Sequence, residues 1–271
     1  MTALVSRPGT LSIGLARGAF ELRQFFRQKE TVVFTFSLPV LLMVLLGSVF
    51  GDVYPDTGLE ASQLFAAGMI GAGIISTSFV SMGIGVALDR ENGTLKRLRG
   101  TPMPATSYFI GKIVLVAVSS LAQAAIMLTI ASLMFGLTVP TSPEKWLTFA
   151  WVFALGVTGC AALGVAASSL ARSVNGAAAG TNIVFLALQF ASGVLVTPIT
   201  ALPDVMVNVS SFFPVKWMCQ GLRSVFLPEE AARYEMAGQW ELGLTALVLS
   251  AWCVAGLLLC RLVFRWTNNR E

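Results

Sequence analysis

The 271-residue chain contains no histidine, and charged residues make up only 12% of it. Without histidine there is no imidazole for a catalytic triad, a proton relay or most zinc sites. A soluble domain carries about 25% charged residues. The low charge, the 55% hydrophobic content and a mean hydropathy of +0.76 therefore indicate an integral membrane protein.

The chain also lacks any cysteine pattern that would indicate a disulfide framework or a metal site. Cys160, Cys253 and Cys260 lie in apolar runs, and Cys219 lies outside them without an obvious mate. We therefore expect no metal to be bound. The net charge is +4, but the basic residues lie at the ends of apolar runs rather than in one patch. This distribution is typical of membrane topology signals and does not favour nucleic-acid binding.

Six apolar stretches are long enough to cross a bilayer, which requires about 20 residues each. The predicted fold class is an all-α integral membrane protein, with an N-terminal arm at residues 1–30 and a six-span domain at residues 31–271. The predicted spans are residues 31–51, 61–88, 110–137, 146–171, 174–197 and 242–264.

The segments between the spans alternate in charge. All but four of the 18 lysines and arginines lie in the N-terminal arm, in residues 89–112, at Arg172 or in the C-terminal tail. Basic segments remain on the cytoplasmic side of a membrane. We therefore expect both termini and the loop after span two to be cytoplasmic.

Residues 11–28 of the arm have the pattern of an amphipathic helix. Six apolar side chains fall within an arc of about 120° on a helical projection, and the arginines Arg17, Arg23 and Arg27 lie on the other side. Such a helix lies along the inner membrane interface with its basic face toward anionic headgroups. It is either a surface anchor alone or also part of a docking surface for a partner.

The central parts of the six spans contain no charged residue. This disfavours an ion-coupled carrier, which commonly uses an intramembrane charge. Polar residues do recur in span five, where Asn175, Asn182 and Gln189 are spaced by seven and share one helical face. They form either the polar wall of a substrate route at a subunit interface or hydrogen bonds between helices. Phe79 in span two is a further candidate for lining a pathway.

The segment before span six, residues 204–241, is unusually apolar for a loop. Pro203 and Pro214 break it into short pieces, and its apolar surface is too large to leave in water. We expect short re-entrant helices that enter the outer leaflet, with Phe213, Pro214 and Trp217 among their residues.

A dense polar segment, Asp89–Pro104 (DRENGTLKRLRGTPMP), separates spans two and three. It contains an acidic residue followed by Asn-Gly-Thr-Leu, then a further leucine, then Thr101-Pro102, and Gly111-Lys112 opens span three. With this ordered set, the whole chain resembles ABC transporter permeases of the type-2 exporter class. Taken without the resemblance, the same segment reads as an ordinary cytoplasmic loop.

The resemblance implies that this segment is a cytoplasmic coupling helix that fits a groove of a separate ATPase subunit. In that role Leu95 and Leu98 would fill the groove, and Glu91 and Arg97 would pair with its rim. The residues that the resemblance assigns to coupling are Asp89, Glu91, Gly93, Thr94, Leu95, Arg97 and Leu98.

The chain has no ATP-binding motif of its own. Gly111-Lys112 lacks the upstream glycine of a Walker A loop and is followed by Ile113. We therefore expect a permease subunit that is not an enzyme and binds no cofactor. The resemblance implies two copies of a cytosolic ATPase that bind ATP and magnesium, and a second permease chain, identical or homologous, in a bacterial cytoplasmic membrane.

The predicted function is efflux of an amphipathic substrate, such as a drug, an antibiotic or a lipid-like molecule. Export of a polysaccharide or glycolipid by the same class of permease is an alternative. An ion-coupled secondary carrier is disfavoured by the uncharged spans. An intramembrane enzyme is disfavoured because the spans contain no histidine and no aspartate.

Overall fold

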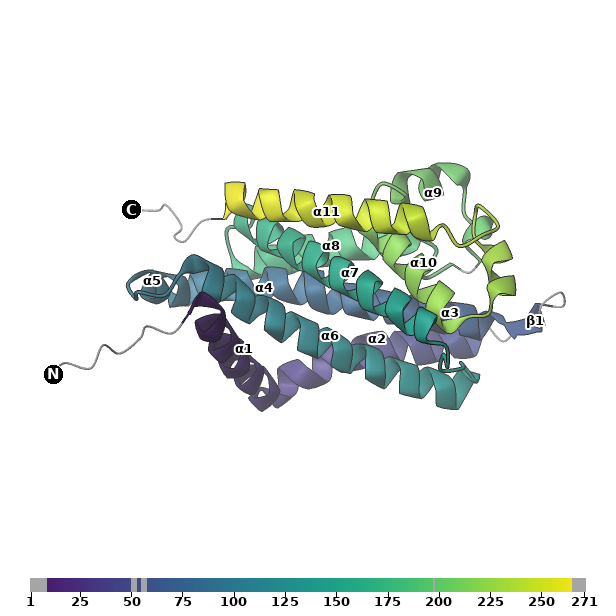
Figure 1. The fold of residues 1–271 in the computed structure, drawn as a ribbon, viewed down its shortest axis with the longest axis horizontal. Helices are drawn as coiled ribbons and strands as arrows, with labels where there is room; N and C mark the ends of the chain where they lie inside the picture. Colours follow the sequence, from purple (N-terminus) through teal and green to yellow (C-terminus); the bar gives the residue numbers. More distant parts are fainter. Residues whose placement is uncertain (1–8, 50–52, 55–57, 197, 265–271) are drawn as a thin grey trace.

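The structure is a computed structural model that describes residues 9–49, 53–54, 58–196 and 198–264. The first eight residues of the predicted arm, the predicted ends of spans one and five at residues 50–51 and 197, and the tail from residue 265 lie outside the described residues. Six apolar helical stretches run along the long axis of the molecule (Figure 1). The prediction of an all-α membrane protein with six spans is thereby confirmed.

The spans follow one another in chain order and differ from the predicted bounds by a few residues. They are α2 (Lys29–Val49), the continuous stretch Ala61–Glu91, α6 (Ala105–Phe135), α7 (Pro143–Leu170), α8 (Val174–Ala191) and α11 (Leu242–Val263). Two short strands, β1 (Val53–Tyr54) and β2 (Leu59–Glu60), pair antiparallel before the second span.

The second span is the centre of the bundle. It consists of α3 (Ala61–Ile75), the π-helical segment η1 (Ser76–Val80) and α4 (Ser81–Glu91). Of its most apolar window, 72% is buried, against 17% for α11 and 22% for α2 and α8. Glycines allow this burial. A side chain at Gly164 on α7 would collide with the Phe79 carbonyl of the second span, and one at Gly83 would collide with Thr181 on α8.

Two element boundaries differ from the predictions for identifiable reasons. Helix α6 begins at Ala105, five residues before the predicted start at 110, because Pro104 holds the preceding backbone extended and the helix can start directly after it. Helix α8 ends at Ala191, well before the predicted residue 197, and Gly193 follows with φ +66°. Only glycine adopts this left-handed conformation at little cost, so the chain turns away there.

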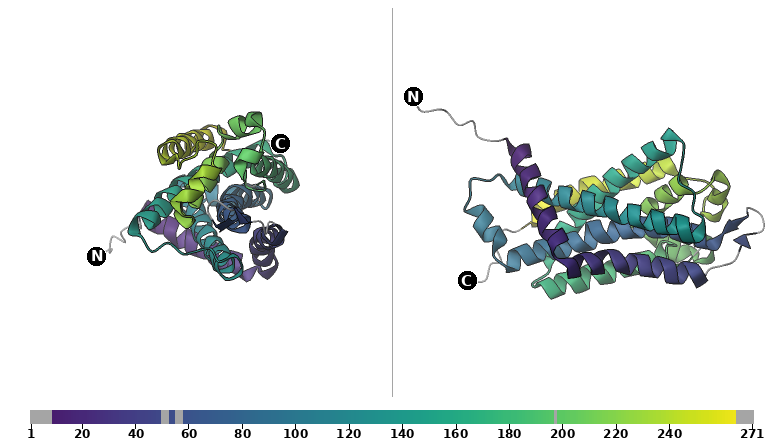
Figure 2. Two further views of the ribbon diagram at one scale, coloured as in Figure 1. Left: turned by 90° about the vertical axis from the view of Figure 1, so that its right-hand side faces the viewer. Right: turned by 90° about the horizontal axis from the view of Figure 1, so that it is seen from below.

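After α8 the chain forms a set of short helices at one end of the bundle. These are η2 (Ile199–Ala201), α9 (Asp204–Ser210), α10 (Pro214–Phe226) and η3 (Glu229–Tyr234). All residues of α10 are buried, packed against α3, α7 and α11. The opposite end of the bundle carries α5 (Thr94–Arg99), the start of α1 (Thr10–Arg27) and the end of α11 (Figures 1 and 2).

Helix α1 lies obliquely across α6 at the α5 end (Figure 2). Its contact face is formed by Gly14, Gly18 and Glu21, and the two glycines meet Ile110 and Val114. Leu11, Leu15 and Phe26 of the predicted apolar arc are exposed, whereas Phe25 packs edge-to-face on Phe36 of α2. The helix therefore has a third face, packed on α6, that the amphipathic pattern did not indicate.

Candidate functional site

Three consecutive charged residues end helix α4, and each one bonds to a different helix. Asp89 contacts α6, because its Oδ2 accepts a hydrogen bond of 2.9 Å from the Tyr108 hydroxyl and lies 2.7 Å from the Lys112 Nζ. Tyr108 is fully buried beneath this pair. The end of α4 is therefore joined to the first turns of α6 by an ion pair and a charge-assisted hydrogen bond.

The next two residues hold the connection between α7 and α8. Arg90 is 8% exposed, and its Nη1 donates to the Ser168 carbonyl at 2.8 Å while its Nη2 donates to the Ser168 hydroxyl at 3.3 Å. This cation satisfies a carbonyl in the last turn of α7, where helix dipoles favour positive charge. Glu91 accepts a bond of 3.0 Å from the Val174 amide, at the N-terminus of α8.

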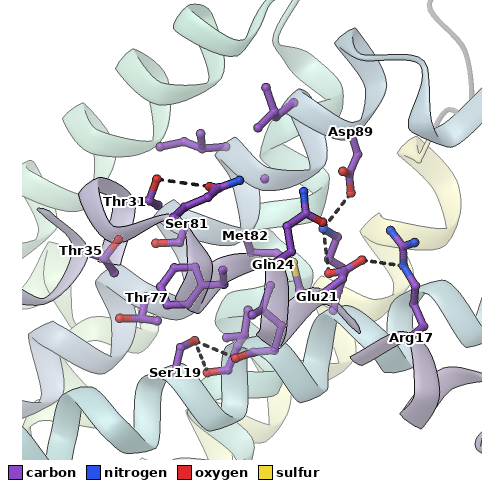
Figure 3. A pocket seen from close by; sticks show the side chains of 18 residues that line it. Arg17, Glu21, Gln24, Thr31, Thr35, Thr77, Ser81, Met82, Asp89 and Ser119 are labelled. Carbon is purple, nitrogen blue, oxygen red and sulfur yellow. Dashed lines mark hydrogen bonds and ion pairs between the residues drawn. The ribbon is translucent and has the colours of Figure 1, made fainter. Parts of the chain in front are cut away.

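Lys112 also joins helix α1 to this network. Its Nζ lies 3.0 Å from Oε2 of Glu21, whose other oxygen, Oε1, accepts a bond of 2.8 Å from Nε of Arg17. The side chains of Lys112 and Glu21 are 8% and 5% exposed. A charged chain thus runs from Arg17 through Glu21 and Lys112 to Asp89, across three helices (Figure 3).

Sequence reasoning did not identify Glu21 as part of a site. It also assigned Arg17 to the headgroup-facing side of the arm, whereas the structure pairs Arg17 with Glu21. The other two predicted interface arginines, Arg23 and Arg27, are exposed. The spacing of four residues between Arg17 and Glu21 is a local signal for such a pair, but nothing local indicates Lys112.

The predicted coupling segment begins with a tight turn. Asn92 follows the last residue of α4, Gly93 comes next with φ +71°, and the short helix α5 starts at Thr94. A side chain at position 93 would be strained in this left-handed conformation. The glycine therefore sets the angle at which α5 leaves the second span.

The two leucines of α5 differ in their environment. Leu95 is 0% exposed and packs inside the chain, so it cannot fill a groove of a partner. The structure thus contradicts the expectation that Leu95 fills a groove of the ATPase subunit. Instead, the burial of Leu95 against its own chain seats α5 on the bundle. Leu98 is half-buried, and Arg97 beside it is exposed, as are the flanking Lys96 and Arg99.

A cavity of about 350 Å³ lies directly beside the charged chain, between α1, α2, the second span and α6 (Figure 3). The four charged residues form one part of its wall. Hydroxyl-bearing side chains from α2, the second span and α6 form another part, and apolar side chains complete it. Its lining includes Thr77, which lies inside the π-helical segment η1, and Ser81, the first residue after that segment.

The predicted pathway residues are not gathered at this cavity. Asn175 and Asn182 lie exposed on α8, and the Asn182 Nδ2 donates to the Ala178 carbonyl of its own helix at 2.8 Å. Gln189 on the same helix is buried. Phe79 lies half-buried in η1 and packs against the core. In the single chain, one of these three polar residues of α8 is therefore buried and the other two are exposed.

The predicted re-entrant residues lie together at the end opposite α5. The Trp217 Nε1 donates to the Ser211 carbonyl at 2.6 Å, and Phe213 stacks on Trp252 with a centroid distance of 5.9 Å. Pro214 occupies the first turn of α10, where a missing amide hydrogen costs nothing. These contacts attach α10 to α11 and to the turn after α9.

Three charged side chains are also buried in this segment, Lys216, Arg223 and Glu235. Arg223 pairs with Glu235 at 2.6 Å, with both side chains at most 5% exposed. Burial lowers the pKa of the Lys216 ammonium, and Glu241 and Glu235 oppose this shift. Lys216 donates to the Ser211 hydroxyl at 2.6 Å. Among the described residues there is no group of three or more side chains suited to hold a metal ion.

Six apolar helices, of which the second span is the most buried, with a basic helical segment at one end, are the architecture of a multi-span membrane protein. The chain belongs to the ABC-2 type transporter family, whose model matches residues 17–227. It is also similar to a Bacillus subtilis (strain 168) protein named "Putative transport permease YvfS". The two are 22% identical over 195 residues, which cover 72% of this chain and 77% of the relative. The chain is thus a membrane subunit of an ABC transporter, and membership of this family implies an ABC ATPase partner.

Proposed function

We propose that this chain forms the translocation pathway of an ATP-driven exporter for an amphipathic substrate, such as a drug, an antibiotic or a lipid-like molecule. Two cytosolic ATPase subunits bind ATP and magnesium and supply the energy. The membrane is the bacterial cytoplasmic membrane, and both termini and α5 face the ATPase side.

The triplet Asp89–Arg90–Glu91 is the observation that carries this proposal. It directly precedes α5, and its three side chains bond to α6, α7 and α8 over distances of 2.7 to 3.3 Å. Hydrogen bonds to charged groups contribute about 1.5–3 kcal/mol each. A displacement of α5 by an ATPase therefore moves the ends of four spans together, including the second span itself.

The exposed part of α5 supplies the docking surface. Leu98 is half-buried, whereas Leu95 is fully buried, and Lys96, Arg97 and Arg99 are exposed around Leu98. An acidic rim around an apolar groove on the ATPase would complement this surface. Leu98 and Arg97 thus keep the predicted coupling roles, while Leu95 has a structural one.

The second permease chain packs, in this proposal, against the open face of α8. Gly176 and Gly180 are four residues apart and exposed, and a side chain at Gly180 would meet nothing within 4 Å. Small residues with this spacing allow close helix approach in a bilayer. Asn175 and Asn182 are exposed beside them. In a dimer these amides would face the second chain and the route between the two chains.

Substitution of Leu98 by Asp tests the coupling role. The tagged permease is purified from its native host in mild detergent, and ATP hydrolysis in the eluate is measured. We expect Leu98→Asp to remain monodisperse on size exclusion and to lose the associated ATPase activity by at least about tenfold, which corresponds to about 1.4 kcal/mol of binding free energy.

The matched control is Val205→Asp, at an exposed apolar position on α9 at the other end of the bundle. It introduces the same charge and should retain the ATPase. If folded Leu98→Asp retains both the ATPase and transport, the coupling role is refuted. Leu95 is not suitable for this test because an aspartate there would be buried and would destabilise the chain itself.

A further inference from the structure

The cavity beside the charged chain has the size and the wall of a ligand site. Its volume of about 350 Å³ falls in the range of about 300–1,000 Å³ found for small-molecule pockets. Exposed residues, including Gln24, Gln28 and Thr31, form its rim, and buried residues such as Thr77 and Met82 form its floor. It is contained within one chain, and no residue of α8 lines it.

The charges in the wall favour a ligand without net charge. Arg17, Glu21, Lys112 and Asp89 line the cavity, but each is already paired with another of the four. With two cations and two anions, the four side chains have no net charge. An ionic ligand would have to break one of these buried pairs, which is costly because an unpaired charge remains.

Hydroxyl groups supply the remaining polarity. The Thr77 and Ser119 hydroxyls donate to the carbonyls of Gly73 and Leu115 on their own helices, at 3.0 and 2.7 Å. Their oxygens can therefore still accept a hydrogen bond from a ligand. Ser81 adds a half-buried hydroxyl one helical turn after Thr77.

The backbone of the second span is also unusual where it borders the cavity. The π-helical turn Ser76–Val80 contains Thr77 and ends directly before Ser81. Such turns are rare and frequently occur at functional sites. Gly85 lies one turn further along, lines the cavity, and has open space where a side chain would begin.

We propose that this cavity binds an uncharged amphiphile whose head carries hydroxyl groups, with the head near Thr77, Ser81 and Ser119 and the tail along the apolar wall. The bound molecule is the transported substrate as it enters from the α5 side. That last step rests on the proposed function, whereas the binding itself does not.

Gly85→Cys provides a reporter inside the cavity that leaves every hydroxyl in place. The variant is reconstituted in liposomes, and its reaction with methyl methanethiosulfonate is followed by mass spectrometry, with the unsubstituted protein as background for the four native cysteines. The probes are octyl glucoside, octyl sulfate and octyltrimethylammonium below their micellar concentrations. They share one tail and differ in the charge of the head.

We expect octyl glucoside, at about four times its dissociation constant, to slow modification of the reporter thiol at position 85 about fivefold, as mass action requires. The two charged probes should slow it less than about twofold at equal membrane concentration. Thr77→Val combined with Ser81→Ala, in the reporter background, should remove most of the protection. Ser48→Ala is the matched control, because Ser48 also bonds to its own helix but does not line the cavity.

Gly243→Cys controls for the membrane, since Gly243 also borders open space but lies at the start of α11, at the other end of the bundle. Equal protection by all three probes, or equal slowing at positions 85 and 243, would mean that the probes only partition into the bilayer and would overturn the proposal. An unreactive thiol at position 85 would show a closed cavity and would overturn it too. Protection that persists in Leu98→Asp separates this site from the coupling role, because no ATPase takes part in the measurement.

Discussion

Lys112 is the residue whose loss should disturb the α5 end most. It lies between Glu21 at 3.0 Å and Asp89 at 2.7 Å, and all three side chains are largely buried. Lys112→Met keeps the volume and the packing on Tyr108 but leaves the Asp89 carboxylate without a cation and Glu21 with Arg17 alone. Removal of one partner from a buried ion pair costs about 3–5 kcal/mol. We expect a loss of stability of this size, with α1 detaching from α6 first.

The free energy of unfolding can be measured in detergent micelles by titration with sodium dodecyl sulfate. Detachment of α1 is followed separately by trypsin cleavage at Arg17 and Arg23, of which Arg17 is protected in the intact network. Lys96→Met is the control, because Lys96 is exposed on α5; it should change stability by less than about 0.5 kcal/mol.

A compensating variant sharpens the test. The compensating variant combines three substitutions, Glu21→Gln, Asp89→Asn and Lys112→Met, so that no charge remains buried at these positions. Replacement of buried ionic groups by neutral residues often changes the free energy of unfolding little. The triple variant should therefore recover most of the stability lost by Lys112→Met alone. If the single variant is within about 1 kcal/mol of the unsubstituted chain, or the triple variant is no more stable than the single, the ionic network does not hold α1 in place.

Three further outcomes follow from other contacts. Arg90→Ala should cost about 3 kcal/mol, whereas Ser168→Ala should cost about 1 kcal/mol because Arg90 still bonds to the carbonyl of that residue; unfolding titrations that give equal losses would contradict this. Gly164→Ala should destabilise the chain by about 1–3 kcal/mol through collision with the backbone of the second span. Gly85→Ala, with open space around it, should be neutral or stabilise the chain by up to about 1 kcal/mol. Thermal melting of the two variants can compare these effects. Burial raises the pKa of the Cys219 thiol to about 12, so at pH 8 only about one thiol in ten thousand is ionised. Maleimide should therefore modify Cys219 only after unfolding, which mass spectrometry can show.

The sequence was sufficient for the spans because a bilayer imposes a length and a composition on each one separately. The turn at Gly93 and the broken helices around Pro214 were also predictable, since glycine and proline act locally. The early start of α6 after Pro104 carried the same local signal and could have been found.

The contacts of the site could not be predicted in the same way. Glu21 and Lys112 are far apart in the chain, and their meeting depends on how α1 crosses α6. Leu95 and Leu98 have the same residue type and lie three positions apart, so no pattern indicates that one is fully buried and the other only half-buried. Such distinctions arise from tertiary packing and not from helical periodicity.

The placement of Asp89, Arg90 and Glu91 on one turn has a consequence for engineering. Successive residues of a helix project about 100° apart, which is why neighbours in the chain can bond to α6, α7 and α8. Inserting or deleting a single residue before Asp89 would rotate the whole triplet and break every one of these bonds at once, whereas exchanging the chain after Asn92 would leave them intact. Chimaeric permeases that accept a foreign ATPase should therefore be joined at Gly93, and nowhere upstream of it in α4.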